Sequence, residues 1–118
     1  MISLKDIRRY CNAKNGVSED FPFDITTLVF RVGKKIFLLI DIDSDPLNVN
    51  MKCDPFLSLE LRRRYWQITP GYHMNKKHWN TIIIDGQIPE KEIFMLIDHS
   101  YDLVLKSLKK SERNLFNL

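Results

Sequence analysis

Cysteine is scarce in this chain, which has only Cys11 and Cys53 among its 118 residues. With no second pair nearby, neither a disulfide framework nor a zinc knuckle is expected. Long apolar runs are lacking too. The longest, residues 36–40, is far too short to span a bilayer, and the first residues contain no apolar signal core. We therefore expect a cytoplasmic protein with reduced thiols and no membrane partner.

Glycine is almost as scarce, and its distribution argues against an enzyme. Each of the four glycines is expected in a turn or helix cap: Gly16, Gly33, Gly71 and Gly86. The chain has no Gly-rich phosphate loop, no Gly-x-Ser-x-Gly motif and no catalytic-cysteine context. The alternating carboxylates Asp41, Asp43 and Asp45 lack the glycine and the distal glutamate of a calcium loop. Neither catalysis nor a cofactor is expected.

What is present is the composition of an ordinary globular protein, with 44% hydrophobic and 28% charged residues. The length predicts a single domain over residues 1–118, large enough for a two-layer core. The net charge of +3 permits a nucleic acid as partner but does not require one.

The first half of the chain predicts a helix followed by three strands. Ser3 and Asp6 resemble a capping box that opens a helix over residues 3–14, and the stretch VSEDFPFD after it is expected to be a linker. From Thr26 the apolar period changes to two, which predicts strands on either side of the turn 33–35. The inward face of the second strand is expected to carry Ile36, Leu38, Ile40 and Ile42. A third strand over 47–53 alternates apolar residues with Asn48, Asn50 and Lys52.

The second half predicts a helix, two strands and a last helix. Asp54 and Pro55 are typical of a helix start, and the basic residues 62–64 suit a last turn. Residues 68–74, interrupted by Pro70 and Gly71, predict an irregular edge strand, and residues 78–84 a fuller one. A helical apolar period follows Pro89, and its basic tail, 106–113, is expected to fray. The order α-β-β-β-α-β-β-α indicates an α+β two-layer sandwich, with an antiparallel sheet and helices on one face.

Basic residues gather in two turns and one acid-free segment. Lys34-Lys35 and Lys76-Lys77 occupy the turns of the two predicted hairpins, and residues 62–77 carry five basic residues and no acid. Lysines at loop tips can contact phosphates and release counterions. The aromatics Tyr65, Trp66, Tyr72 and Trp79 could stack on bases, although Trp79 fits partly buried packing better. The alternative is that the lysines are solvated turn residues.

The histidines do not define a metal site. His73 and His78 could face each other across a hairpin, but a third ligand such as Asp85, His99 or Cys53 would have to come from the fold. No metal is expected, and His99 is expected at the surface or near a helix cap.

One segment resembles a known family. Residues 70–79, PGYHMNKKHW, and residues 100–104, SYDLV, closely resemble the motifs of the MmcQ/YjbR family, and Gly33-Lys34-Lys35 fits its pattern more loosely. The resemblance implies a YjbR-like, secretion-chaperone-like α/β sandwich. It also implies DNA binding through a double-wing motif, with the two hairpins as wings.

On that resemblance, together with the basic segment, the chain is expected to be a non-enzymatic module that grips the phosphate backbone of DNA or RNA. The expected contact residues are Lys34, Lys35, Arg62, Arg63, Arg64, Tyr72, Asn75, Lys76, Lys77 and His78. Asn80 would offer a further amide nearby, and the Arg62–Arg64 run could act as a phosphate clamp.

Two other functions remain open from the sequence. One is a protein-binding or chaperone-like module that uses a sheet face or the last helix, which the polar residues Asn48, Asn50 and Lys52 mildly disfavour. The other is a small-molecule site between the 70–79 hairpin and the last helix, with Tyr72, His73 and Tyr101 as polar groups.

Overall fold

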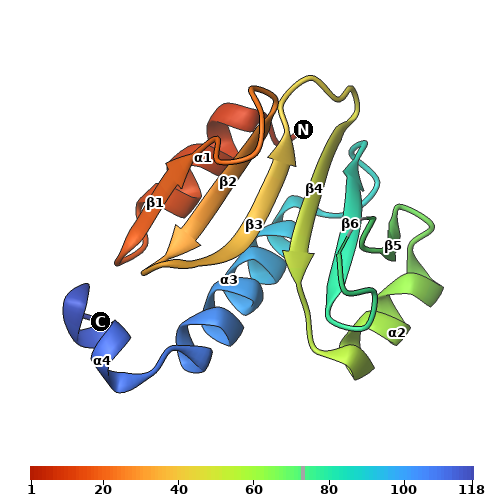
Figure 1. Cartoon of the computed structure of the whole chain (residues 1–118). Coiled ribbons are helices and arrows are strands. Elements are labelled where there is room, and N and C mark those ends of the chain that lie inside the picture. Colours follow the sequence, from red (N-terminus) through yellow and green to blue (C-terminus); the bar gives the residue numbers. More distant parts are fainter. Residues whose placement is uncertain (73) are drawn as a thin grey trace.

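A computed structural model describes residues 1–72 and 74–118 and contains one six-stranded antiparallel sheet, in the order β1-β2-β3-β4-β6-β5 (Figure 1). The strands are β1 (Val17–Asp20), β2 (Thr27–Val32), β3 (Lys35–Asp41), β4 (Leu47–Lys52), β5 (Ile68–Pro70) and β6 (Trp79–Ile84). The helices are α1 (Leu4–Asn12), α2 (Pro55–Arg64), α3 (Glu90–Ser107) and α4 (Lys110–Leu115).

The helices α1, α2 and α3 lie behind the sheet as it is viewed in Figure 1, with α3 running across β3 and β4. The buried apolar side chains of β2, β3, β4 and β6 form one core cluster with Ile7 and Cys11 of α1 and Ile93 and Ile97 of α3. The expected α+β sandwich with helices on one face is therefore confirmed.

Local signals set several boundaries as expected. The Ser3 hydroxyl accepts the amide N–H of Asp6, and the Asp6 carboxylate accepts that of Ser3, so α1 begins with a complete capping box. The Asp54 carboxylate accepts the amides of Phe56 and Leu57, which places Pro55 at the first helical position of α2.

Two elements were not expected from the sequence. Residues 17–20, assigned to a linker, form the edge strand β1, in which Val17 and Glu19 are half-buried while Ser18 and Asp20 are exposed. Because the segment contains charged residues, this alternation could not be recognised as a strand in the sequence. The extended conformation becomes favourable only through pairing with β2. The expected fraying tail instead forms α4, whose first backbone amide, from Lys109, is accepted by Glu112.

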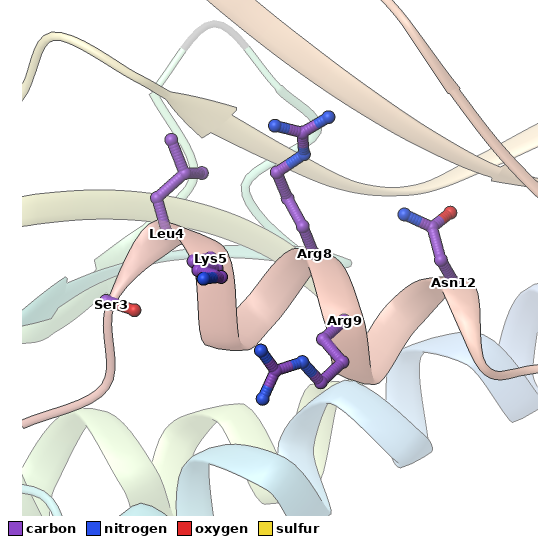
Figure 2. Close-up of a pocket in the computed structure, with 6 residues that line it drawn as sticks. All are labelled: Ser3, Leu4, Lys5, Arg8, Arg9 and Asn12. Atoms are coloured by element: carbon purple, nitrogen blue, oxygen red, sulfur yellow. The ribbon is translucent and has the colours of Figure 1, made fainter.

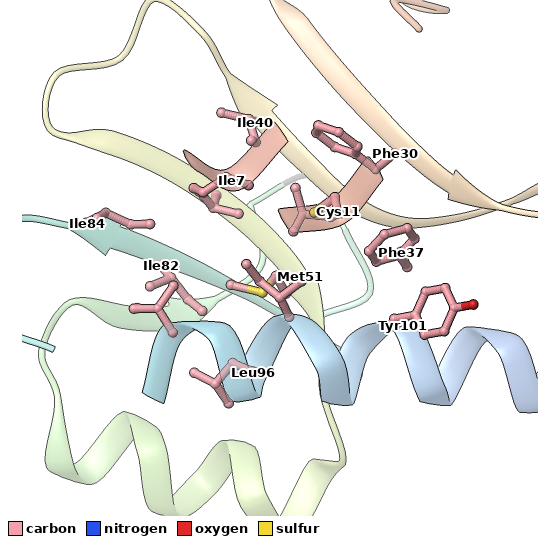
Figure 3. Close-up of a cluster of buried hydrophobic side chains, with 14 of the residues drawn as sticks. Ile7, Cys11, Phe30, Phe37, Ile40, Met51, Ile82, Ile84, Leu96 and Tyr101 are labelled. Carbon is pink, nitrogen blue, oxygen red and sulfur yellow. The ribbon is translucent and has the colours of Figure 1, made fainter. Parts of the chain in front are cut away.

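The inward face of β3 also differs from the expected alternation. A register shift between Phe30 and Arg31 pairs Phe30 with Leu38 and Arg31 with Ile36, leaving Phe37 unpaired between them. Phe37 and Leu38 are both fully buried, whereas Ile36 is only half-buried. The Phe37 ring meets Tyr101 of α3 edge-on, with ring centroids 5.5 Å apart (Figure 3). The irregularity adds a large aromatic side chain to the core.

Candidate functional site

Strand directions bring the two Lys-Lys turns to the same end of the sheet. The β2–β3 turn contains Lys34, and β3 begins with Lys35. Since β3 pairs antiparallel with β4, and β4 with β6, the end of β4 at Lys52 lies beside the start of β6 at Trp79. The loop that joins β5 to β6 is therefore at the same end as the β2–β3 turn, the lower end in Figure 1. We call this the basic end: Lys34, Lys35, Lys52, Lys76 and Lys77.

Carboxylates gather at the opposite end of the sheet. Asp24 precedes β2 and accepts the amides of Thr26 and Thr27, while Asp41 closes β3 opposite Thr27. The β3–β4 turn adds Asp43 and Asp45, and Asp85 follows the last residue of β6. The sheet therefore has an acidic end and a basic end. Asp54 and Glu112 also lie near the basic end, but Asp54 caps α2 and Glu112 pairs with Lys34.

The β2–β3 turn is in contact with the C-terminal segment. The Nζ of Lys34 lies 3.2 Å from Glu112, and the Nζ of Lys35 donates to the Ser107 carbonyl at 3.3 Å. The pKa of Glu112 is lowered, first by the Lys109 amide that it accepts and then by Lys34. The same segment, whose Leu108 side chain lies against Gly33 of the turn, also carries exposed Lys106, Lys109 and Lys110. The sequence reading missed these three as candidates, although their basic run was visible.

The β5–β6 hairpin is shaped by Asn75 and Lys76. The Asn75 side chain accepts the amide of Lys77 at 3.0 Å, and its carbonyl accepts the amides of His78 and Trp79. The Nζ of Lys76 donates to the Gly71 carbonyl at 3.3 Å. Asn75 thus forms the turn, and the side chain of Lys77 is exposed at its tip. His73 lies outside the described residues.

The three arginines of α2 have different environments. The Nε of Arg62 donates to Asn80 at 2.8 Å, and one terminal nitrogen donates to the Lys76 carbonyl at 2.7 Å. Arg64 pairs with Glu60 and Glu92, and Arg63 is exposed. The three arginines do not form a single phosphate clamp. Arg62 supports the hairpin through its hydrogen bonds, while Arg64 faces α3.

Asn80 completes this support. It is 1% exposed and donates to the hydroxyl of the equally buried Ser58, so it joins α2 to β6. Buried polar groups with satisfied partners hold neighbouring elements in one arrangement. Asn80 is therefore a support for Arg62 and the hairpin rather than an exposed hydrogen-bonding group.

Gly71 permits the close approach of the two hairpin strands. A Cβ there would lie 2.9 Å from the Cβ of Trp79 and 3.1 Å from the Trp79 carbonyl oxygen. We expect Gly71→Ala to lower the free energy of unfolding by about 1–3 kcal/mol, because the clash is with backbone and a Cβ that cannot rotate away. Urea denaturation measures this, with Thr69→Ala, at an exposed position of β5 two residues before Gly71, as control. Equal stability of the two variants would contradict the steric argument.

The aromatic residues are not grouped as one stacking surface. Tyr72 is 72% exposed, while Trp79 is half-buried opposite Lys52. Tyr65 donates its hydroxyl to Glu92 at 2.6 Å, and the hydrogen bond to that carboxylate raises its pKa. Trp66 is 70% exposed, two residues after the end of α2. Tyr72 and Trp79 are the two that lie beside the basic end.

Residues of the family-like motif at 100–104 are buried and join α3 to the rest of the core. Ser100 is fully buried, accepts the amide of Lys52 and donates to the Phe37 carbonyl, so it links α3 to β3 and β4. Tyr101 donates its hydroxyl to the Asn15 carbonyl at 2.6 Å. This position is beneath β3, and not beside Tyr72 as a shared small-molecule site would require.

The two cysteines are buried, and His99 hydrogen-bonds to the backbone beside a helix cap. Burial raises the pKa of Cys11 to about 12 and also raises that of Cys53, so both thiols stay protonated near neutral pH. The Nε2 of His99 accepts the amide of Asp54 at 3.1 Å, beside the cap of α2. Over residues 1–72 and 74–118, no group of three His, Cys, Asp or Glu side chains could hold a metal ion.

Helix α1 carries a separate basic surface. A depression along it is lined by Ser3, Leu4, Lys5, Arg8, Arg9 and Asn12 (Figure 2). Arg8 and Asn12 both contact Glu19, and Figure 2 shows Arg8 and Arg9 leaving the helix in different directions. The basic groups do not converge on one ligand, so we place no function here.

Comparisons with known proteins agree with the motif and the fold. The YjbR family model matches residues 12–103. The chain belongs to the YjbR family. Among its relatives, the uncharacterized protein YjbR of Escherichia coli K12 is 29% identical over 115 residues, or 97% of each chain. YyaQ of Bacillus subtilis is 32% identical over 117 residues and is matched over 98% of its length.

Solved structures of similar proteins match the fold of this YjbR-family chain over its whole length or most of it. The Deinococcus radiodurans protein DR2400, described as a DUF419 domain, is 41% identical with a TM-score of 0.93, over 100% of this chain and 90% of that one. A Pseudomonas syringae protein is 29% identical with a TM-score of 0.75, over 87% and 99% of the two chains.

Among the described residues, no helix combines the length and the apolar character needed to cross a membrane.

Proposed function

We propose that this YjbR-family protein is a non-enzymatic nucleic-acid-binding protein that holds the phosphate backbone at the basic end of its sheet. The observation that carries the proposal is the shared end of the two Lys-Lys turns, with the aspartates of the other turns at the far end. Such a separation orients the protein in the field of a polyanion, even when the net charge is only +3.

The two turns play different parts in this proposal. Lys77 is exposed at the tip of a hairpin that Arg62 and Asn80 support, so it is presented to a ligand without a large ordering cost. Lys34 has a 64% exposed side chain, and its partner Glu112 is on the neighbouring helix. A phosphate therefore competes with Glu112 for Lys34 and meets Lys35 and the C-terminal lysines next to it.

A salt titration tests the proposal. Fluorescence anisotropy with labelled duplex DNA, single-stranded DNA and RNA of one length should show binding at low salt that weakens steeply as salt rises. For duplex DNA, each phosphate contact contributes about −0.9 to the slope of log K against log salt, so three or four contacts predict a slope of about −3. Absence of binding to all three probes at low salt would overturn the proposal.

A further inference from the structure

Helix α4 is held at the basic end of the sheet by a buried acid. Of its six residues, all within the described part of the chain, Glu112 alone is buried, and the apolar Leu115 is 80% exposed. A surface helix ordinarily packs through an apolar stripe, and a helix this short is marginal by itself. The position of α4 therefore depends on what Glu112 and the residues on either side of the helix contact.

The two carboxylate oxygens of Glu112 have different partners. Oε1 accepts the backbone amide of Lys109 at 3.0 Å and so caps the start of α4, while Oε2 lies 3.2 Å from the Nζ of Lys34 in the β2–β3 turn. Residues 106–118 carry four basic residues and one acid, which is Glu112. The one acid of a basic segment is thus the group that is turned toward Lys34.

Apolar contacts hold the residues on either side of α4. A Cβ at Gly33 of the β2–β3 turn would lie 3.3 Å from the side chain of Leu108 and 3.4 Å from the ring of Phe116. Leu108 is buried, whereas Phe116 is 41% exposed. Between these two anchors, the contact of α4 with the turn is the ion pair of Glu112 and Lys34. A second anion can compete for such a pair, because an ion pair near the surface is only weakly stabilising.

We propose that Glu112 is an internal substitute for phosphate, and that α4 is a displaceable cover on the basic end. In the free protein the Glu112 carboxylate occupies the ammonium group of Lys34, where a phosphate oxygen would make the same kind of charge-assisted hydrogen bond. When a nucleic acid binds, its phosphate takes the place of Glu112, and Lys34 joins Lys35 in holding the backbone. The inference rests on the proposed function and adds the regulation of the same site.

The variant Glu112→Gln separates the cover from the fold of α4. The side-chain carbonyl of glutamine can still accept the Lys109 amide, but its amino group cannot pair with Lys34. Fluorescence anisotropy with a labelled DNA duplex at low salt should show an affinity about three- to fivefold higher than that of the unchanged protein, since the ion pair no longer competes. Circular dichroism checks that the variant folds.

The matched control is Glu19→Gln. Glu19 is also an ion-paired glutamate with a second partner: it pairs with Arg8 of α1 and accepts a hydrogen bond from Asn12 at 3.3 Å. Its replacement removes the same charge and breaks one ion pair away from the Lys-Lys turns. We expect the affinity for the duplex to stay unchanged in this variant.

Hydrogen exchange followed by mass spectrometry tests the displacement directly on the full chain. Amides of residues 110–118 should exchange faster when saturating duplex DNA is added, because the covering segment leaves the turn. In Glu112→Gln the same amides should exchange faster without any nucleic acid.

The outcomes separate the cover from the proposed function. If the unchanged protein binds DNA and Glu112→Gln binds it equally well, or if both glutamine variants gain equally, the cover is wrong and the proposed function stands. Slower exchange of residues 110–118 with DNA would mean that phosphate binds over a docked α4, which also contradicts the cover. Absence of binding by the unchanged protein and both variants would remove the two proposals together.

Discussion

Replacing both hairpin lysines, Lys76→Glu with Lys77→Glu, is expected to weaken binding of a DNA duplex by about 100-fold at 0.1 M salt. Each lost phosphate contact costs about tenfold at that ionic strength, and the new carboxylates add repulsion. The loss should be similar for unrelated DNA sequences, since backbone contacts carry no sequence information. Fluorescence anisotropy measures it, and the slope of log K against log salt should become shallower by about 2.

The control for this variant changes the charge by the same amount elsewhere. Lys5→Glu with Arg9→Glu alters two exposed basic residues of α1, a helix whose first residues lie close to Asp45 near the acidic end. It should reduce affinity far less than the hairpin variant does. Equal losses for the two variants would mean that net charge alone governs binding, and the proposed role of the basic end would be wrong.

Phe37→Ala is expected to lower the free energy of unfolding by about 3–5 kcal/mol. Phe37 is fully buried and meets Tyr101 edge-on at the unpaired position of β3, so removing its ring leaves a cavity in the core. Urea denaturation followed by circular dichroism gives the value. A loss of this size is a large part of the stability of an ordinary domain.

Phe23→Ala is the matched control for Phe37→Ala, since it removes the same ring from a position that is 66% exposed. We expect a change of less than about 0.5 kcal/mol. If Phe37→Ala were equally mild, the core would have to collapse into the space of the missing ring. The Phe37 ring, which the register shift in β3 places in the core, would then contribute little to stability.

Local patterns in the sequence predicted most of the elements. The capping box of Ser3 and Asp6 and the Asp54-Pro55 start depend on residues within one helical turn, so they can be recognised without the fold. The alternation of residues 47–52 is equally local and is retained in β4. Strand β1 was not predicted, because four mostly polar residues have little tendency of their own to be extended. Only pairing with β2 stabilises this conformation.

The candidate site was less accessible to sequence reasoning than the fold. The dibasic turns were visible, but the partners of their side chains were not: Glu112 is 78 positions from Lys34 in the numbering and meets it only through the packing of α4. Arg62, which the sequence places among the expected phosphate contacts, donates hydrogen bonds to Asn80 and to the Lys76 carbonyl and so supports the hairpin. Both contacts join segments that are distant in sequence, and periodicity carries no information about them.

By itself, the sequence determined the helices and most strands, the dibasic composition of two turns and the membership of a family, because caps, alternation and motifs are properties of neighbouring residues. Only the tertiary structure decided that the two Lys-Lys turns lie at one end of the sheet, with Asp24, Asp41, Asp43, Asp45 and Asp85 at the other, and that α2 keeps Phe56 and Leu59 in solvent. The reason is that strand order and helix orientation arise from long-range burial of apolar surface, which selects among arrangements that the local patterns leave equally possible.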